Sequence, residues 1–180
     1  MSFIDLIKKR RSIRKFSDTK IDRVLIEKCL EAARLSPSAC NAQPWKFIVV
    51  DNPELKEKVA HESYGLFDSF NKFTHQAPVM VVVVTEKANL TSQMGTLIKK
   101  IQYPFIDIGI AAEHFCLQAA ELGLGTCMIG WFNEKPLKEI LSIPKSKKVV
   151  LMIALGYPVV EKEVDKKRKS LDEMSSFDSY

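Results

Sequence analysis

The segment RRSIRKF, from Arg10 to Phe16, places four cationic side chains and one hydroxyl within seven residues. A short amphipathic run, Phe3 to Lys9, precedes it, so the segment is expected at a helix end and in the loop that follows. Arginine presents a planar fork of donors that matches phosphate oxygens, and a serine hydroxyl and backbone amides can bind the remaining ones. A basic run can equally be a solvated surface loop, so this segment alone does not distinguish a phosphate site from a surface loop. The other segments of the chain are needed for that choice.

Length and composition indicate a single folded domain spanning residues 1–180. The chain has 180 residues, of which 46% are hydrophobic, enough for a real core and too many for a disordered protein. The longest apolar run, Ala77 to Val84, is too short to cross a bilayer. No basic segment followed by an apolar stretch marks a secretory signal at the N-terminus. We therefore expect a cytoplasmic protein with no membrane partner.

The net charge of +5 is concentrated at the two ends of the chain, between Lys8 and Lys20 and between Lys162 and Lys169. A nucleic-acid-binding protein can have such a distribution. A site for a phosphorylated cofactor, built from both ends of the chain, can have it as well. The sequence shows no recognisable nucleic-acid-binding module, and its aromatic residues are not interleaved with the basic runs, which favours the cofactor.

The four cysteines do not suggest a metal centre. Cys29, Cys40, Cys116 and Cys127 form no C-x-x-C pair, and the three histidines are scattered. In a reducing compartment the cysteines are expected to be thiols rather than disulfides. We therefore predict that the protein has no metal site.

Hydrophobic periodicity predicts an alternation of helices and strands. The run from Pro78 to Thr85 is apolar on both faces, as in a central strand that is covered on both sides. The stretch from Thr126 to Phe132 reads as a strand interrupted at Gly130, and a glycine there often marks close approach by a ligand or another backbone. Further strands are expected at 46–50 and 148–155, and helices at 3–9, 22–35, 53–59, 104–122 and 135–141.

The helix predicted from Pro104 to Leu122 is apolar or small over most of its surface, which indicates burial nearly all round. Asp107 and His114 lie on its narrow polar stripe, whereas Glu113 lies about 100° away. A buried carboxylate needs a partner. We therefore expect Glu113 to form a salt bridge across a subunit interface rather than to act in catalysis.

Two further segments carry polar groups that could meet a ligand. The loop from Pro37 to Trp45 contains two amides, which can bind a heterocycle's edge or simply their own backbone. Between Tyr64 and Phe73 four aromatics recur every three residues, which favours a core-facing helix stripe. Asn71 lies between the last two of these aromatics and could reach a ligand. The segment from Glu86 to Tyr103 reads as a loop or lid without a firmer interpretation.

With these pieces in order, the chain resembles the nitroreductase family of FMN-dependent oxidoreductases. RRSIRKF resembles the family's N-terminal phosphate and ribityl motif, and PSACNAQPW resembles its flavin-ring loop. GLGTCMIGWF resembles the segment against the ring, and LGYP followed by KKR resembles its C-terminal phosphate clamp. Each motif alone is weak, but four of them in the family's order, with buried strands between them, make a strong signal.

The resemblance implies an α+β fold, with a central mixed β-sheet flanked by helices, in an intertwined homodimer that exchanges its C-terminal tails. It implies two FMN sites at the dimer interface. The phosphate would meet Arg10, Ser12, Lys166 and Arg168, with Arg11 nearby, and Arg14 would lie toward the pyrimidine edge. The ring would meet Ile129 and Gly130 of one subunit, Pro37, Ser38, Ala39 and Asn41 of the other, and a mid-chain contact from Asn71.

The resemblance also implies the chemistry. FMN carries the hydride transfer, so the protein supplies binding, orientation and electrostatics. NADH or NADPH would reduce the flavin and leave, and a small-molecule acceptor such as a nitroaromatic or quinone would then enter the same pocket. No residue is assigned as a catalytic acid or base, and Arg14 is the candidate for stabilising charge on the reduced ring. Specialised chemistry within the family, such as reductive dehalogenation or flavin fragmentation, is the main alternative.

Overall fold

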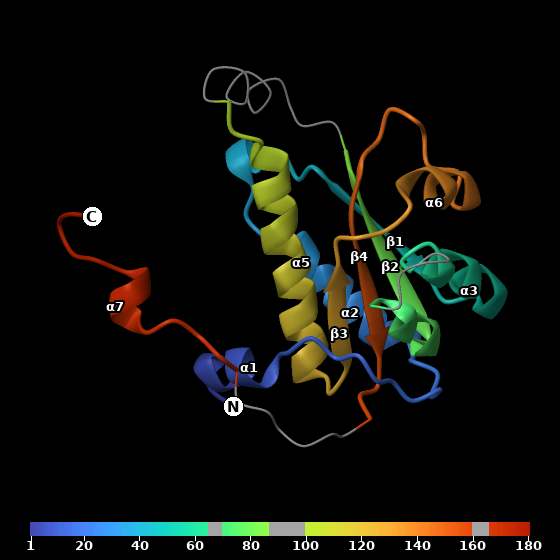
Figure 1. The fold of residues 1–180 in the computed structure, drawn as a ribbon, viewed down its shortest axis with the longest axis horizontal. Coiled ribbons are helices and arrows are strands. Elements are labelled where there is room, and N and C mark those ends of the chain that lie inside the picture. The colour runs from blue at the N-terminus through green and yellow to red at the C-terminus, as the bar shows by residue number, and fades with distance from the viewer. Residues whose placement is uncertain (65–69, 87–99, 160–165) are drawn as a thin grey trace.

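A four-stranded β-sheet forms the centre of the protein (Figure 1). The computed structural model describes residues 1–64, 70–86, 100–159 and 166–180. In the order β1-β2-β4-β3, every pair of neighbouring strands runs antiparallel. The α+β fold class is confirmed, but the sheet is antiparallel rather than mixed over the strands described. The strands are β1 (Trp45–Val50), β2 (Val79–Thr85), β3 (Gly125–Ile129) and β4 (Val149–Gly156).

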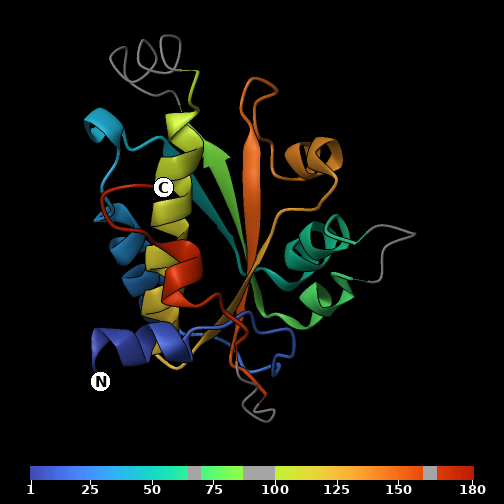
Figure 2. The ribbon, with the colours of Figure 1, turned by 60° about the vertical axis from the view of Figure 1, so that its left-hand side comes forward.

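Helices cover both faces of this sheet (Figures 1 and 2). On one face, α2 (Arg23–Arg34) and the long α5 (Tyr103–Glu121) pack side by side. On the other face lie α3 (Pro53–His61), the 3-10 helix η2 (Lys72–Gln76) and α6 (Glu134–Ile140). The remaining short helices are α1 (Phe3–Lys9), η1 (Ala39–Asn41) and α7 (Leu171–Met174).

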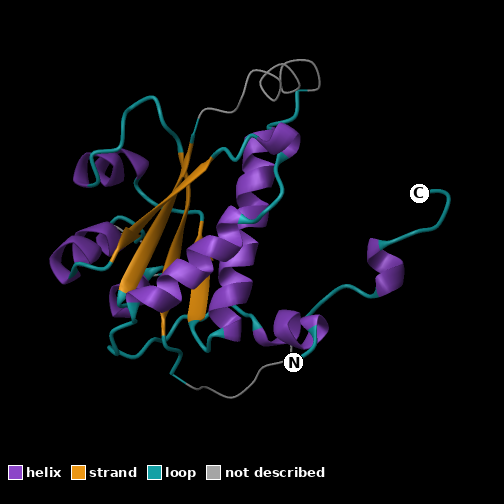
Figure 3. Ribbon diagram, turned by 180° about the vertical axis from the view of Figure 1, so that it is seen from behind, coloured by secondary structure: helices purple, strands orange, loops and turns teal. Residues whose placement is uncertain are grey.

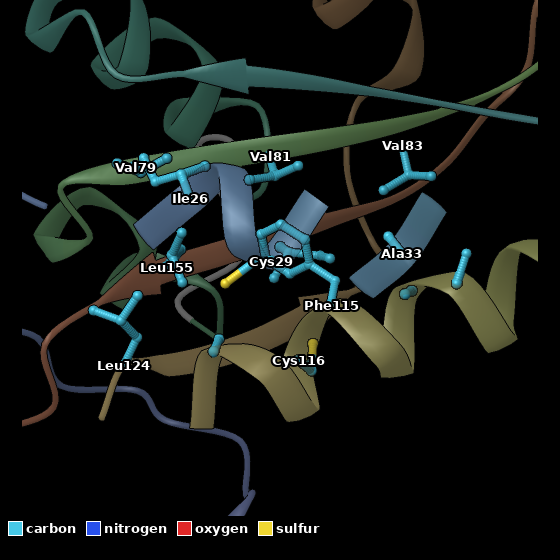
Figure 4. Close-up of a cluster of buried hydrophobic side chains, with 14 of the residues drawn as sticks. Ile26, Cys29, Ala33, Val79, Val81, Val83, Phe115, Cys116, Leu124 and Leu155 are labelled. Carbon is cyan, nitrogen blue, oxygen red and sulfur yellow. The ribbon is translucent and has the colours of Figure 1, made fainter. Parts of the chain in front are cut away.

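The pattern of β2 explains the two-sided cover. Every residue from Val79 to Val84 is buried, as expected for a central strand. Because successive side chains of a strand point to opposite faces, Val79, Val81 and Val83 join the core beneath α2 and α5 (Figure 4). Met80 and Val82 join a second core beneath α3 and α6.

Local signals set several element boundaries. The side chain of Asp22 accepts a hydrogen bond from the Val24 amide at the start of α2, which confirms the predicted cap. Gly123 adopts a φ of +78° just after α5, where the Leu124 amide donates to the Ala119 carbonyl. The turn expected from the glycines that follow this helix is therefore present.

Three expectations about single elements were wrong. β3 ends at Ile129 rather than Phe132, because the chain leaves the sheet at Gly130. Phe70 is 88% exposed, so the aromatic stripe is not a core face there, while Phe73 does pack against the core. α5 is not buried nearly all round within one chain, since Phe105 near its start is 45% exposed. Phe67 and residues 87–99 of the expected loop or lid lie outside the described residues.

The N-terminal segment crosses the ends of β3 and β4, where glycines leave room for it. A Cβ built on Gly125 would come within 2.7 Å of the Ile13 side chain, and one on Gly156 within 2.7 Å of Phe16. The Ile13 amide donates to the Thr126 carbonyl at 2.8 Å. The two glycines therefore let residues 12–17 lie directly on the sheet's end.

We expect Gly125→Ala to lower the free energy of unfolding by about 1–3 kcal/mol, because the new methyl group forces Ile13 out of its place. Chemical denaturation of the protein without ligands measures this. Gly130→Ala is the matched control, since a Cβ there meets no atom within 4 Å. Equal stability of the two variants would show that Ile13 is not packed against Gly125.

The C-terminal segment leaves the body of the protein after Lys166. α7 stands clear of the sheet and of α5 (Figures 1 and 3). Its Leu171 and Met174 are 75% and 64% exposed, and Phe177 behind it is 92% exposed. An arm with three large apolar side chains in solvent lacks the packing that would hold it against its own chain. No helix in the described part of the chain has the length and apolar character needed to cross a membrane.

Candidate functional site

The N-terminal segment brings its cations toward the other end of the chain through backbone pairing. The Ser17 amide donates to the Tyr157 carbonyl at 2.9 Å, and the Val159 amide donates to the Lys15 carbonyl at 3.1 Å. Ser12 forms a parallel bridge with Thr126 at the start of β3. The segment that follows β4 and the segment that follows α1 therefore run together.

Lys166 fastens the two ends of the chain to each other. Its ammonium donates to the carbonyls of Ile7 at 3.0 Å and Lys8 at 2.7 Å, and also to that of Arg10. These are carbonyls at and just beyond the end of α1, where a cation also complements the helix dipole. These three bonds use all three donors of the ammonium. The sequence pattern did not suggest this contact with the end of α1, and the expected contact of Lys166 with a phosphate stays a prediction.

Four cations from the two chain ends gather around this cap. Burial, followed by the neighbouring charges of Arg10, Arg168 and Arg11, lowers the pKa of the Lys166 ammonium. In the same neighbourhood Glu113 contacts Arg10, with 3.2 Å between Nε and the carboxylate oxygen. Among the residues that the structure describes, Glu113 is the carboxylate that contacts this group, and like charges held together favour an anion. A phosphate group fits this donor set.

Glu113 differs from its expected role. The salt bridge joins it to Arg10 of the same chain rather than to a second subunit. Its side chain is 44% exposed and so is not a buried carboxylate. It holds the Arg10 guanidinium from the side of α5, which sets the direction in which the remaining donors point.

A second group of predicted residues meets near Phe73. The Arg14 guanidinium lies 5.9 Å from the centre of the Phe73 ring, within the range of a cation–π contact. Asn71 donates through its side-chain amide to the Ser63 carbonyl at 3.0 Å and the Trp131 carbonyl at 3.3 Å. Asn71 therefore connects the loop that follows β3 to the start of η2. It donates both side-chain amide hydrogens to backbone carbonyls.

The end of β3 offers backbone rather than side chains. Ile129 is buried at 3% exposure, while Gly130 is exposed and has no atom within 4 Å of a built Cβ. A flat group could therefore approach the Gly130 backbone closely, as the sequence pattern suggested. The Trp131 side chain, 75% exposed, stands beside this opening.

The loop with Pro37, Ser38, Ala39 and Asn41 lies away from the cations. It precedes β1, and Trp45 pairs with Thr85, whereas the cations lie at the sheet end with Gly125 and Gly156. These are opposite ends of the sheet (Figure 1). One chain therefore does not bring all the predicted residues together, which is the arrangement expected if the loop serves the site of a second subunit.

The loop is held internally and by α5. The Ser38 hydroxyl accepts from the Gln43 amide at 2.9 Å, and the Gln43 side chain donates to the Asn41 side chain at 3.0 Å. Asp107 of α5, 4% exposed, accepts a bond from the Ala39 amide at 3.1 Å. Asp107 stood out in the sequence only as a member of a polar stripe, and its loop contact was not predicted.

The cysteines and carboxylates do not add another centre. All four cysteines are thiols, and burial raises the pKa of the Cys127 thiol. Within the described ranges, no three or more His, Cys, Asp or Glu side chains are grouped so that they could hold a metal ion. Two surface grooves, one between α2 and β1 and one beside α3 and α6, lie outside the residue groups described above.

Comparison with known proteins gives consistent matches over most of the chain. Residues 7–157 match the sequence model of the nitroreductase family. A candidate NADH dehydrogenase/NAD(P)H nitroreductase of Archaeoglobus fulgidus is 35% identical, and the match covers 89% of this chain and 87% of that protein. The solved structure of an FMN-dependent nitroreductase from Clostridium difficile has a TM-score of 0.81 at 29% identity, covering 99% of this chain and 100% of the other. Iodotyrosine deiodinase 1 of Mus musculus is 26% identical over 96% of this chain and 68% of its own.

Proposed function

Because the chain belongs to the nitroreductase family, we propose that it transfers a hydride from NAD(P)H through bound FMN to a nitroaromatic, quinone or similar acceptor by a ping-pong mechanism. The observation that carries this proposal is the gathering of Arg10, Arg11 and Arg168, from opposite ends of the chain, around Lys166. Such a cluster suits the phosphate of FMN.

We assign the phosphate to Arg10, Ser12 and Arg168, with Arg11 nearby. Lys166 contributes to phosphate binding indirectly, because its three bonds to the end of α1 hold the tail that carries Arg168. This division of roles explains why cations from both chain ends are needed.

The ring portion of the cofactor is assigned to the other residue groups. Arg14, placed over Phe73, faces the pyrimidine edge, where a cation stabilises the negative charge that reduction creates. The backbone of Ile129 and Gly130 lies against the ring, and Asn71 fixes the loop beyond them. When bound, FMN supplies the hydride chemistry itself.

The site requires a homodimer, with Pro37, Ser38, Ala39 and Asn41 contributed by the second subunit. The distance between this loop and the cations in one chain supports this assembly. The exposed arm around α7 supports an intertwined form in which tails are exchanged. Residues 1–180 act as a single FMN-binding domain, and the four thiols suit the reducing cytoplasm in which we place the protein.

Steady-state kinetics test the mechanism. Since one pocket over the flavin serves donor and acceptor in turn, varying both should give parallel double-reciprocal lines and inhibition at high substrate. NADH and NADPH should each be compared with a nitroaromatic and a quinone. Intersecting lines would indicate a ternary complex and contradict the shared pocket.

Cys40→Ala and Cys127→Ala should retain most of the wild-type turnover. Both cysteines lie in segments assigned to the ring, but the thiolate is the reactive form, and burial disfavours it at Cys127. Turnover per bound FMN is the quantity to compare. Loss of turnover with FMN still bound in either variant would reveal covalent chemistry by that cysteine.

Reductive dehalogenation is the second candidate reaction, because 96% of this chain matches iodotyrosine deiodinase 1. In that reaction an aryl carbon–iodine bond is replaced by carbon–hydrogen, and iodide leaves at the expense of two electrons and a proton. Iodide release from iodotyrosine by the FMN-loaded protein under NAD(P)H distinguishes the two. Faster turnover of iodotyrosine than of any nitroaromatic or quinone would favour it.

A further inference from the structure

The loop from Ser36 to Gln43 has a strained backbone. Cys40, Asn41 and Gln43 adopt φ angles of +52°, +50° and +46°. Residues other than glycine visit this left-handed region at a cost and remain there only when surrounding contacts hold them. The bonds within the loop run among residues 38–43, and the Ser36 amide donates to the Ala33 carbonyl of α2. None of these bonds uses the Ala39 amide or attaches the loop to α5.

Two side chains of α5 provide this attachment. Asp107 accepts from the Ala39 amide at 3.1 Å, and the His114 ring nitrogen Nδ1 shares a hydrogen with the Ser36 hydroxyl at 2.8 Å. Seven residues are about two helical turns, so both side chains lie on one face of α5. Together they attach the first four residues of the loop to a rigid helix.

Burial of the Asp107 carboxylate costs more free energy than a purely structural contact with the loop requires. The side chain is 4% exposed, and its second carboxylate oxygen is buried without a hydrogen-bond partner among the residues described. A buried polar atom without a partner destabilises the fold. An apolar residue at this position would leave the Ala39 amide without its bond to α5.

We infer that Asp107, supported by His114, is a positioning residue that holds the flavin-ring loop in its strained conformation for the site of the partner subunit. The inference rests on the proposed function, in which Ser38, Ala39 and Asn41 contact the ring. Glu113 of the same helix contacts Arg10 on the phosphate side. α5 therefore braces the phosphate side of one site and the ring loop of the other.

The test compares Asp107→Ala, Asp107→Asn and the control Ile108→Val by amide hydrogen exchange and by flavin binding. Asparagine keeps a side-chain oxygen that can accept from Ala39, while alanine removes it. Ile108 is the fully buried neighbour on α5 and has only apolar contacts to lose, so it reports general loosening of the helix.

In the protein without flavin, Asp107→Ala should speed exchange at residues 38–43 by about tenfold or more, and Asp107→Asn should restore most of the protection. In the flavin-loaded assembly, Asp107→Ala should weaken FMN and riboflavin by the same factor, about tenfold, because the loop meets the ring and not the phosphate. The flavin absorbance band should shift in this variant alone.

Unchanged loop exchange in Asp107→Ala, or an equal change in Ile108→Val, would overturn the inference. If Asp107→Ala does not fold, the wild-type Ala39 amide decides the matter, since exchange as fast as in an unstructured peptide would mean that no bond holds it. A wild type that binds no flavin would remove the proposed function, while the exchange data would still report whether Asp107 holds the loop.

Discussion

Arg10→Ala should weaken FMN binding by about tenfold to a hundredfold, because it removes a charged hydrogen bond to the phosphate worth about 1.5–3 kcal/mol. Glu113 holds this guanidinium in place, and the Arg10 side chain is only 19% exposed. Titration of the protein with FMN and with riboflavin, which lacks the phosphate, measures the effect. The affinity for riboflavin should change little.

Arg23→Ala is the matched control for this variant. Arg23 also pairs with a carboxylate, donating to Asp51 at 2.7 and 3.0 Å, but it lies at the start of α2 and outside the cation cluster. Its loss should leave both affinities unchanged. Full FMN affinity in Arg10→Ala, or equal losses for FMN and riboflavin, would mean that Arg10 does not bind the phosphate.

Ending the chain before Lys166 should reduce FMN affinity more than Arg10→Ala does. The truncation removes Arg168 together with the lysine that fastens the tail to α1. Lys166→Met in the full chain separates the two roles, since it loosens the tail but leaves Arg168 present. Retention of wild-type FMN affinity by the truncated chain would contradict the assignment of the C-terminal cations.

The protein should sediment as a homodimer down to low micromolar concentration, and Phe105→Asp should dissociate it and release FMN. Obligate dimers bury large apolar surfaces. Exposed apolar side chains occur on α1, where Phe3 is 66% exposed, on α5, where Phe105 and Ile106 are 45% and 52% exposed, and on the arm around α7. The carboxylate that Phe105→Asp introduces would be buried in such an interface without a partner, which disfavours the dimer.

Val24→Asp serves as the control for the dimer, because Val24 on α2 is 53% exposed but belongs to none of these three surfaces. It should remain dimeric and flavin-loaded. A stable monomer of the wild type that retains FMN would contradict both the dimer and the shared site.

Much of the fold followed from the sequence because burial leaves a clear pattern. The buried run of β2, the cap at Asp22 and the turn at Gly123 depend on near neighbours in the chain, so composition and spacing predict them. The sequence predicts an end of β3 that lies too late in the chain. A strand ends where its pairing with the neighbouring strand ends, and for β3 that neighbour is β4, which is distant in sequence.

For the candidate site, the sequence predicted which segments take part but not which side chains contact one another. The motifs predict which stretches hold the cofactor, and the structure gathers the cations of both chain ends, as that prediction requires. The contacts of Lys166, Glu113 and Asp107 join positions far apart in the chain, so no local pattern contains them. The role that we propose for the loop from Pro37 to Asn41 depends on a second subunit, which a single sequence does not display.

Anaerobic mixing separates the two halves of the proposed reaction and tests it most directly. The FMN-loaded protein should lose its yellow colour on addition of NADH or NADPH with no acceptor present. After removal of the nucleotide, a nitroaromatic or quinone alone should restore the colour, with one equivalent of acceptor consumed for each two-electron step. Bound FMN that stays oxidised with both nucleotides, or that is reoxidised only while the nucleotide is still bound, would contradict hydride transfer through a single shared flavin site.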